Sequence, residues 1–196
     1  MVHEELRRRL LEMSEEDQRV RSELAATGEL FDGYAPRMEE VHRRNAAALE
    51  AVIQRHGWPG RSLVGADGAQ AAWLVLQHAI GDPALQRRCL PLLREAAARG
   101  EAEPAQAAFL EDRISFFERR PQRYGTQFDW DENGRLSPWL IEDPERVDEY
   151  RRSVGLEPLA ERVRRMAEEA EGEPAPKDLK KRREEMLSWA KSVGWL

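Results

Sequence analysis

The sequence predicts a mainly α protein, a single-domain helical bundle of about five to seven helices with one short β-hairpin. Apolar residues recur three or four positions apart along most of the chain, which is the spacing of one helix face. Charged residues make up 35% and hydrophobic residues 41% of the 196 positions, a soluble composition. A single stretch carries the signal of a hairpin, and the length fits one domain.

Periodic apolar spacing predicts the first three helices. These helices span residues 3–26, 36–56 and 67–80. Pro36 suits the first turn of the second helix, and Gly57 can take the left-handed conformation that ends it. Asp67 is the N-cap candidate of the third helix, which is the most apolar run of the chain.

Prolines mark the starts of four further helices, since a proline is tolerated in the first helical turn. These prolines are Pro83, Pro104, Pro144 and Pro158. Pro83 and Pro144 each follow an aspartate that can cap the helix. Between the helices, Asn133-Gly134 lies between aromatic-rich flanks and predicts the turn of the hairpin.

A change in composition near the C-terminus predicts the domain organisation. Residues 1–171 are expected to form one helical domain. Residues 172–176 belong to the run E-G-E-P-A-P and indicate a linker. Residues 177–196 follow as a C-terminal helical extension, with amphipathic spacing that favours packing on the domain or on a second copy.

Four polar residues interrupt the apolar stripes of four predicted helices. They are Asp17, Asn45, His78 and Asp112. His78 shares a helix face with Leu74 and Val75, so it points into the core and needs a partner. In a shared internal cluster, a histidine beside a carboxylate can take or give a proton near neutral pH. A buried network that only fixes the helix register is the structural alternative.

We expect neither a metal nor a cofactor. His56, His78 and Asp112 have ligand chemistry, but they lie on separate elements, and no H-x-x-x-H pair places two ligands on one helix turn. The D-x-D-x-N-G run at residues 129–134 matches only the first half of a calcium loop, with Leu140 where the last ligand belongs. A turn built from Asp, Asn and Gly is the better interpretation.

Composition also argues against several function classes. The net charge of −6 provides no overall field that attracts nucleic acid. No run approaches the roughly 20 apolar residues of a membrane span, and the start lacks the apolar segment of a signal peptide. The single cysteine, Cys89, cannot form an internal disulfide. We therefore expect a cytoplasmic protein without nucleic-acid or membrane partners, and the sequence leaves a small-molecule ligand and a homo-oligomer open.

Several motifs occur in order along the chain. They are M-x-x-x-D-Q-x-x-R, H-G-W-P, Q-H-A, D-R and Y-G-T-Q. The pattern covers residues 5–160 and resembles an uncharacterised bacterial, mainly actinobacterial, family of domains of unknown function. The chain departs from this pattern at His42, where an acid is expected three residues before Asn45. The resemblance implies no reaction, and residues 172–196 look like an extension beyond the family domain.

These observations lead to one functional hypothesis and one alternative. The hypothesis is an internal polar pocket for a small polar molecule, with hydrolysis or another acid–base reaction in which His78 is the base and Asp112 orients it. The candidate substrate-binding residues are Asp17, Gln18, Arg21, Asn45, Tyr124 and Gln127. The alternative is a non-catalytic interaction module or an immunity-type helical module.

Overall fold

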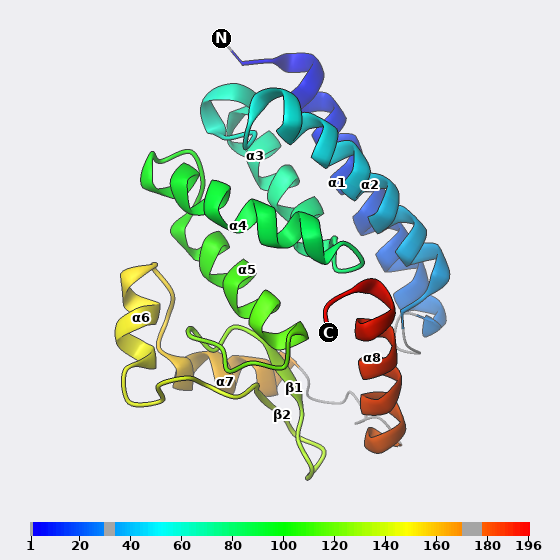
Figure 1. The fold of residues 1–196 in the computed structure, drawn as a ribbon, viewed down its shortest axis with the longest axis vertical. Coiled ribbons are helices and arrows are strands. Elements are labelled where there is room, and N and C mark those ends of the chain that lie inside the picture. The colour runs from blue at the N-terminus through cyan, green and yellow to red at the C-terminus, as the bar shows by residue number, and fades with distance from the viewer. Residues whose placement is uncertain (1, 30–33, 170–177) are drawn as a thin grey trace. The chain divides into compact units, whose positions relative to one another are not determined.

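The computed structural model describes residues 2–29, 34–169 and 178–196. Within these residues it contains eight helices and one antiparallel hairpin (Figure 1). The helices are α1 (Glu4–Thr27), α2 (Pro36–His56), α3 (Arg61–His78), α4 (Pro83–Ala98), α5 (Pro104–Phe117), α6 (Val147–Ser153), α7 (Leu159–Glu169) and α8 (Leu179–Val193). The strands are β1 (Phe128–Trp130) and β2 (Leu136–Pro138). The mainly α fold with one short hairpin is therefore confirmed.

Contacts within the chain divide it into two compact units, Met1–Glu103 and Pro104–Leu196. The first unit holds α1 to α4, and the second holds α5 to α8 with the hairpin. The predicted domain of residues 1–171 therefore includes parts of both units. The predicted linker at residues 172–176 lies outside the described residues.

The first unit has a core between α1, α2 and α3, each of which packs against the other two. The inward stripe of α1 is the predicted one. Its buried side chains are Leu6, Leu10, Met13, Asp17, Val20 and Leu24. A carboxylate in the middle of this stripe needs partners, because an unpaired buried charge is costly.

The helix α3 consists of two helical segments joined at Gly65. This glycine has φ +76° and ψ 170°, a conformation that strains residues with a side chain. Just beyond it, Asp67 accepts hydrogen bonds of 2.8 Å from the Gly68 N–H and from Arg7 Nε. The segment that ends in His78 therefore begins close to the predicted start.

The hairpin forms where Asn133-Gly134 predicts it. The strands β1 and β2 pair antiparallel, with Asp129 opposite Ser137. Gly134 has φ +70°, and Asp131 Oδ1 accepts hydrogen bonds of 2.8 and 2.9 Å from two backbone N–H groups of the turn. The D-x-D-x-N-G run thus builds a turn, as its incomplete match to a calcium loop led us to expect.

The terminal helix α8 packs against the rest of the second unit. The rings of Trp189 and Trp195 have their centroids 5.6 and 5.1 Å from that of Phe117 in α5. Arg182 Nη1 lies 2.5 Å from Asp129 Oδ1, and Trp195 is 3% exposed. We predicted packing of the C-terminal extension on the domain or on a second copy, and these contacts are of the first kind.

Candidate functional site

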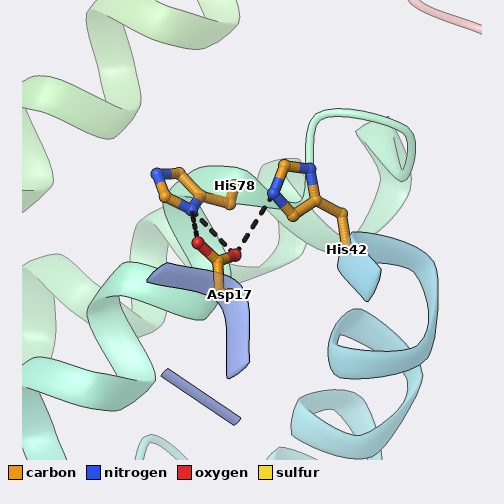
Figure 2. A group of neighbouring side chains, drawn as sticks. All are labelled: Asp17, His42 and His78. Atoms are coloured by element: carbon orange, nitrogen blue, oxygen red, sulfur yellow. Dashed lines mark hydrogen bonds and ion pairs between the residues drawn. The ribbon is translucent and has the colours of Figure 1, made fainter. Parts of the chain in front are cut away.

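Three side chains from three helices of the first unit meet at one point. Asp17 comes from α1, His42 from α2 and His78 from the last residue of α3 (Figure 2). His78 Nδ1 lies 2.9 Å from Asp17 Oδ1 and 3.0 Å from Oδ2. His42 Nε2 lies 3.2 Å from Asp17 Oδ2. We call these three residues the His–Asp–His cluster.

Helical spacing places each member of the cluster toward the core of the unit. Asp17 follows the buried Met13 by four residues, and His42 follows the buried Met38 by four. His78 ends the apolar segment of α3. Because α1, α2 and α3 all pack against one another, the three inward positions come together.

The Asp17 carboxylate is the buried charge at the centre of the cluster. Asp17 has 1% of its surface exposed to solvent. Burial alone would raise the pKa of this carboxyl, but the contacts with His42 and His78 hold the pKa well below its usual range. The carboxylate is therefore ionised at neutral pH and fixes the orientation of both imidazole rings.

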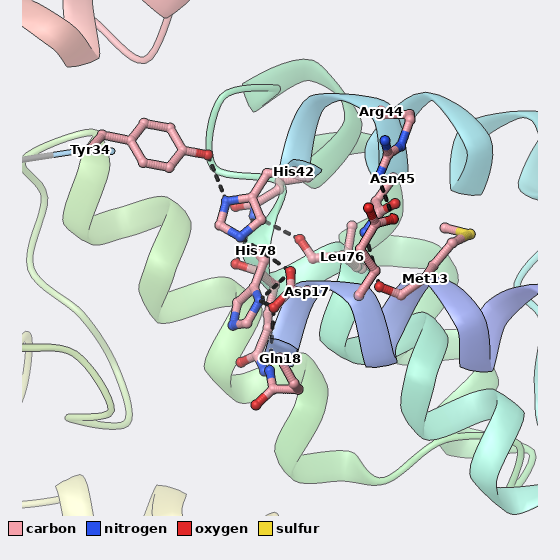
Figure 3. Close-up of polar contacts among 12 residues, drawn as sticks. Met13, Asp17, Gln18, Tyr34, His42, Arg44, Asn45, Leu76 and His78 are labelled. Atoms are coloured by element: carbon pink, nitrogen blue, oxygen red, sulfur yellow. Dashed lines mark hydrogen bonds and ion pairs between the residues drawn. The ribbon is translucent and has the colours of Figure 1, made fainter. Parts of the chain in front are cut away.

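Tyr34 contacts the far side of His42. Its hydroxyl lies 2.7 Å from His42 Nδ1 (Figure 3). Burial raises the pKa of Tyr34 above its usual value, so the hydroxyl keeps its proton. The other ring nitrogen, His42 Nε2, is buried and lies at ion-pair distance from Asp17, but no atom around it has hydrogen-bond geometry. Tyr34 therefore holds one nitrogen of this ring while the other faces the carboxylate.

His78 is the most accessible member of the cluster. Its side chain is 20% exposed, against 10% for that of His42. The two imidazole centroids are 5.1 Å apart, with the rings tilted by 40°. Gln18 Nε2 approaches the carboxylate of Asp17 to 3.3 Å. Solvent thus reaches the cluster at the His78 ring.

The structure separates Asn45 and Arg21 from this contact network. Asn45 Nδ2 donates a hydrogen bond of 3.1 Å to the carbonyl oxygen of Met13, which ties α2 to α1 (Figure 3). Arg21 is exposed on α1. Of the four residues that interrupt the stripes, Asp17 and His78 are the pair that meets.

Asp112 accepts hydrogen bonds from a loop of the second unit. Its carboxylate oxygens accept hydrogen bonds of 2.9 to 3.1 Å from the backbone N–H groups of Arg123, Tyr124 and Thr126. The carboxylate that contacts His78 Nδ1 within the first unit is that of Asp17, and orientation of this imidazole by Asp112 stays a prediction. Stripe spacing identifies a buried carboxylate, but it does not distinguish a histidine partner from a row of backbone donors.

The Y-G-T-Q loop is held in place within the second unit. Arg151 of α6 donates to the carbonyl oxygens of Tyr124 at 2.6 Å and of Gly125 at 3.4 Å. Gln122 Oε1 accepts a hydrogen bond of 2.8 Å from the N–H of Gln127. Tyr124 and Gln127, which we predicted as substrate contacts, therefore belong to a loop that is fixed by hydrogen bonds with α5, with α6 and within the loop.

Two residues of the cluster region were not among the predicted site residues. His42 lies three residues before Asn45 and four after Met38, so the helical spacing that selected Asn45 also marks His42. Tyr34 lies just before α2, where no periodicity marks it. Its contact with His42 depends on the path of the chain into that helix.

The fold and the cluster define a helical protein with a buried carboxylate between two histidines. The chain belongs to a family of unknown function, DUF6624, whose model matches residues 4–174. No curated protein and no solved structure matches the chain. In the part of the chain that the structure describes, no helix combines the length and the apolar character that crossing a membrane requires.

Proposed function

We propose that the chain is an enzyme that hydrolyses a small polar molecule, with the His–Asp–His cluster as its reacting centre. The observation that carries this proposal is the ionised, buried Asp17 carboxylate in contact with two imidazoles. Burying a charge is costly, and the neutral bond from Asn45 to the Met13 carbonyl already ties α1 to α2. Titratable groups gathered at such a cost, within reach of solvent, are typical of acid–base sites.

In this proposal His78 accepts the proton of an attacking water molecule, and Asp17 orients the imidazole. The water oxygen forms a bond to the electrophilic centre of the substrate, and the leaving group takes the proton from the imidazolium as its bond breaks. Arg21 lies one helical turn after Asp17 and provides a cation for an anionic group of the substrate. Gln18 supplies a second polar contact on the same helix.

The proposal includes the setting of the protein. The acidic composition and the single cysteine support a cytoplasmic, soluble protein that binds a small molecule in place of nucleic acid or a membrane. The motif pattern supports a bacterial, mainly actinobacterial, origin. The loop residues Tyr124 and Gln127 remain candidates for contacts with the substrate.

The test is hydrolysis of a panel of small chromogenic esters, amides, phosphate esters and glycosides by the full chain. The informative variants are His78→Asn and Asp17→Asn, which remove the proton acceptor and the charge that orients it. His56→Asn is the matched control, because His56 is exposed at the end of α2. We expect the parent and the control to hydrolyse the same class, and the two cluster variants to lose about 100-fold or more in kcat/KM.

Two results would overturn this proposal. One is activity of His78→Asn equal to that of His56→Asn. The other is a folded parent protein that hydrolyses no class of the panel, with or without added divalent cations, which would favour the alternative of a non-catalytic interaction module.

A further inference from the structure

The His–Asp–His cluster presents three ligand atoms to one point in space. These atoms are His42 Nε2, His78 Nδ1 and a carboxylate oxygen of Asp17, and they all lie within 4.8 Å of one another (Figure 2). We infer that the cluster binds one divalent first-row transition cation, with Zn²⁺ as its representative. The inference adds a bound cation to the site of the proposed function. Binding of the cation does not depend on that function, whereas a role of the cation in hydrolysis rests on it.

The distances within the cluster suit a shared cation. A cation about 2.0–2.1 Å from each ligand atom keeps those atoms about 2.9–3.4 Å apart in octahedral or tetrahedral geometry. His78 Nδ1 lies 2.9 Å, and His42 Nε2 3.2 Å, from the carboxylate oxygens of Asp17. The two nitrogens are at most 4.8 Å apart, so they need to approach by about 1.9 Å or less.

The buried nitrogen of His42 provides a second observation that points to a cation. His42 Nε2 has no partner with hydrogen-bond geometry, although the His42 side chain is 90% buried. The Tyr34 hydroxyl, 2.7 Å from Nδ1, can accept the proton of that nitrogen and leave a lone pair on Nε2. In this tautomer the lone pair of Nε2 faces the ionised carboxylate, and a cation between the two would be attracted by both.

The arrangement around His42 also matches the outer shell of a metal site. A histidine that ligates a metal usually donates its other ring N–H to a polar group, which fixes the ring and its tautomer. Tyr34 is placed to be that group. Tyr34 is a positioning residue, since its hydroxyl contacts His42 Nδ1, whereas the atom that would bind the cation is His42 Nε2.

The donor set indicates the class of cation. Imidazole nitrogens with one carboxylate suit Zn²⁺, Fe²⁺ and related ions, whereas Mg²⁺ and Ca²⁺ prefer sites made of oxygen ligands. With two neutral imidazoles and one carboxylate as ligands, the cluster carries one negative charge, so the complex with a divalent ion has a net charge of about +1. Three protein ligands leave a position for water, whose pKa such an ion lowers to near 7. This water would then take over the proton chemistry that His78 performs without the ion.

The test measures binding of Zn²⁺ alone to the full chain after treatment with a chelator, by isothermal titration calorimetry. We expect one Zn²⁺ per chain and no comparable binding of Mg²⁺ or Ca²⁺. His42→Gln should weaken Zn²⁺ binding by at least about tenfold, and Tyr34→Phe by about tenfold with the fold intact. His56→Gln is the matched control and should bind like the parent, because His56 is exposed and lies outside the cluster.

A second measurement keeps the inference falsifiable if a cluster variant does not fold. In the unmodified chain, Co²⁺ should cause paramagnetic shifts of the ring signals of His42 and His78. The histidines outside the cluster, His3 and His56, should be much less affected. Absence of Zn²⁺ binding, or Zn²⁺ binding that His56→Gln reduces and His42→Gln does not, would overturn the inference.

Hydrolysis assays on the same samples separate this inference from the proposed function. Full hydrolytic activity of the metal-free chain would overturn the catalytic part of the inference and leave the proposed function in place. Stoichiometric Zn²⁺ binding without hydrolysis of any substrate class would overturn the proposed function and leave the metal site.

Discussion

Asp112→Asn separates a structural carboxylate from a catalytic one. The substitution keeps the size of the side chain and replaces one acceptor oxygen by an NH₂ group. Asp112 Oδ1 accepts from the N–H groups of Arg123 and Tyr124, while Oδ2 accepts from those of Tyr124 and Thr126. If the amide oxygen takes the place of Oδ1, the NH₂ group faces the buried N–H of Thr126, and two donors oppose each other.

The magnitude follows from this geometry. Leaving one buried N–H without an acceptor costs about 1–3 kcal/mol, so we expect Asp112→Asn to destabilise the protein by about 2 kcal/mol. For a chain of this length that loss lowers Tm by about 4–8 °C. Asp112→Ala removes the acceptor of three N–H groups and should cost more, about 3–6 kcal/mol.

Chemical denaturation of the three proteins, followed by circular dichroism, checks this expectation. Glu132→Gln is the matched control, since it makes the same change from carboxylate to amide at an exposed position, and it should stay within about 0.5 kcal/mol of the parent. If Asp112→Asn instead unfolds like the parent, the hydrogen bonds to the loop do not have the role assigned to them. A loss of hydrolysis without a loss of stability would return Asp112 to the catalytic site.

Three further predictions concern residues outside the cluster, all tested on the folded chain. Gly125→Ala should destabilise the protein by about 2 kcal/mol, because Gly125 has φ +64° and an added Cβ would lie 2.9 Å from Leu159 Cδ1. Gly81→Ala is the control: an added Cβ there has no atom within 4 Å, so the free energy of unfolding should change by less than about 0.5 kcal/mol. Trp195→Ala should cost about 3 kcal/mol in denaturant titrations, since its side chain is 3% exposed, and a loss below about 1 kcal/mol would contradict the packing of the terminal helix. Burial raises the pKa of the Cys89 thiol to about 12. The native protein should therefore not react with a thiol reagent at about pH 8. Its free energy of unfolding should fall as the pH rises above about 8.5, because only the unfolded chain then loses the thiol proton.

The helix α2 shows what local chemistry determines without knowledge of the fold. The sequence predicts a helix at residues 36–56, and the structure has Pro36–His56. Both ends lie at the predicted residues: Pro36 is in the first turn, and Gly57, with φ +72° and ψ −162°, ends the helix. No tertiary contact is needed for either prediction.

The start of α6 shows where local chemistry stops being enough. Asp143-Pro144 predicts a helix start, but α6 begins at Val147. Asp143 Oδ1 still accepts a hydrogen bond of 3.3 Å from the N–H of Arg146, so the capping interaction exists within a turn. Whether such a turn continues as a helix depends on what the next residues pack against, and a capping pattern does not carry that information.

In the candidate site too, the sequence identifies which residues are buried but not which residues they contact. Interruption of an apolar stripe finds Asp17 and His78 because burial is encoded by helical spacing. The partner of each buried group is set by contacts between distant segments. His42 and His78 reach Asp17 from α2 and α3, 25 and 61 residues further along the chain. Spacing within one helix does not show which distant residues will be neighbours, which is why it did not identify the contact between Asp17 and His78.

Asp17 and Asp112 show why a buried carboxylate alone does not define a function. Both interrupt an apolar stripe, and each is less than 2% exposed. The carboxylate oxygens of Asp112 accept four hydrogen bonds from backbone N–H groups, which neither lose protons nor bind cations, so this carboxylate holds its loop. The partners of Asp17 are imidazoles, each with a nitrogen that can carry a proton or a lone pair. Asp17 and its two histidines therefore have partners that can exchange protons or bind a cation, whereas the backbone N–H groups around Asp112 cannot.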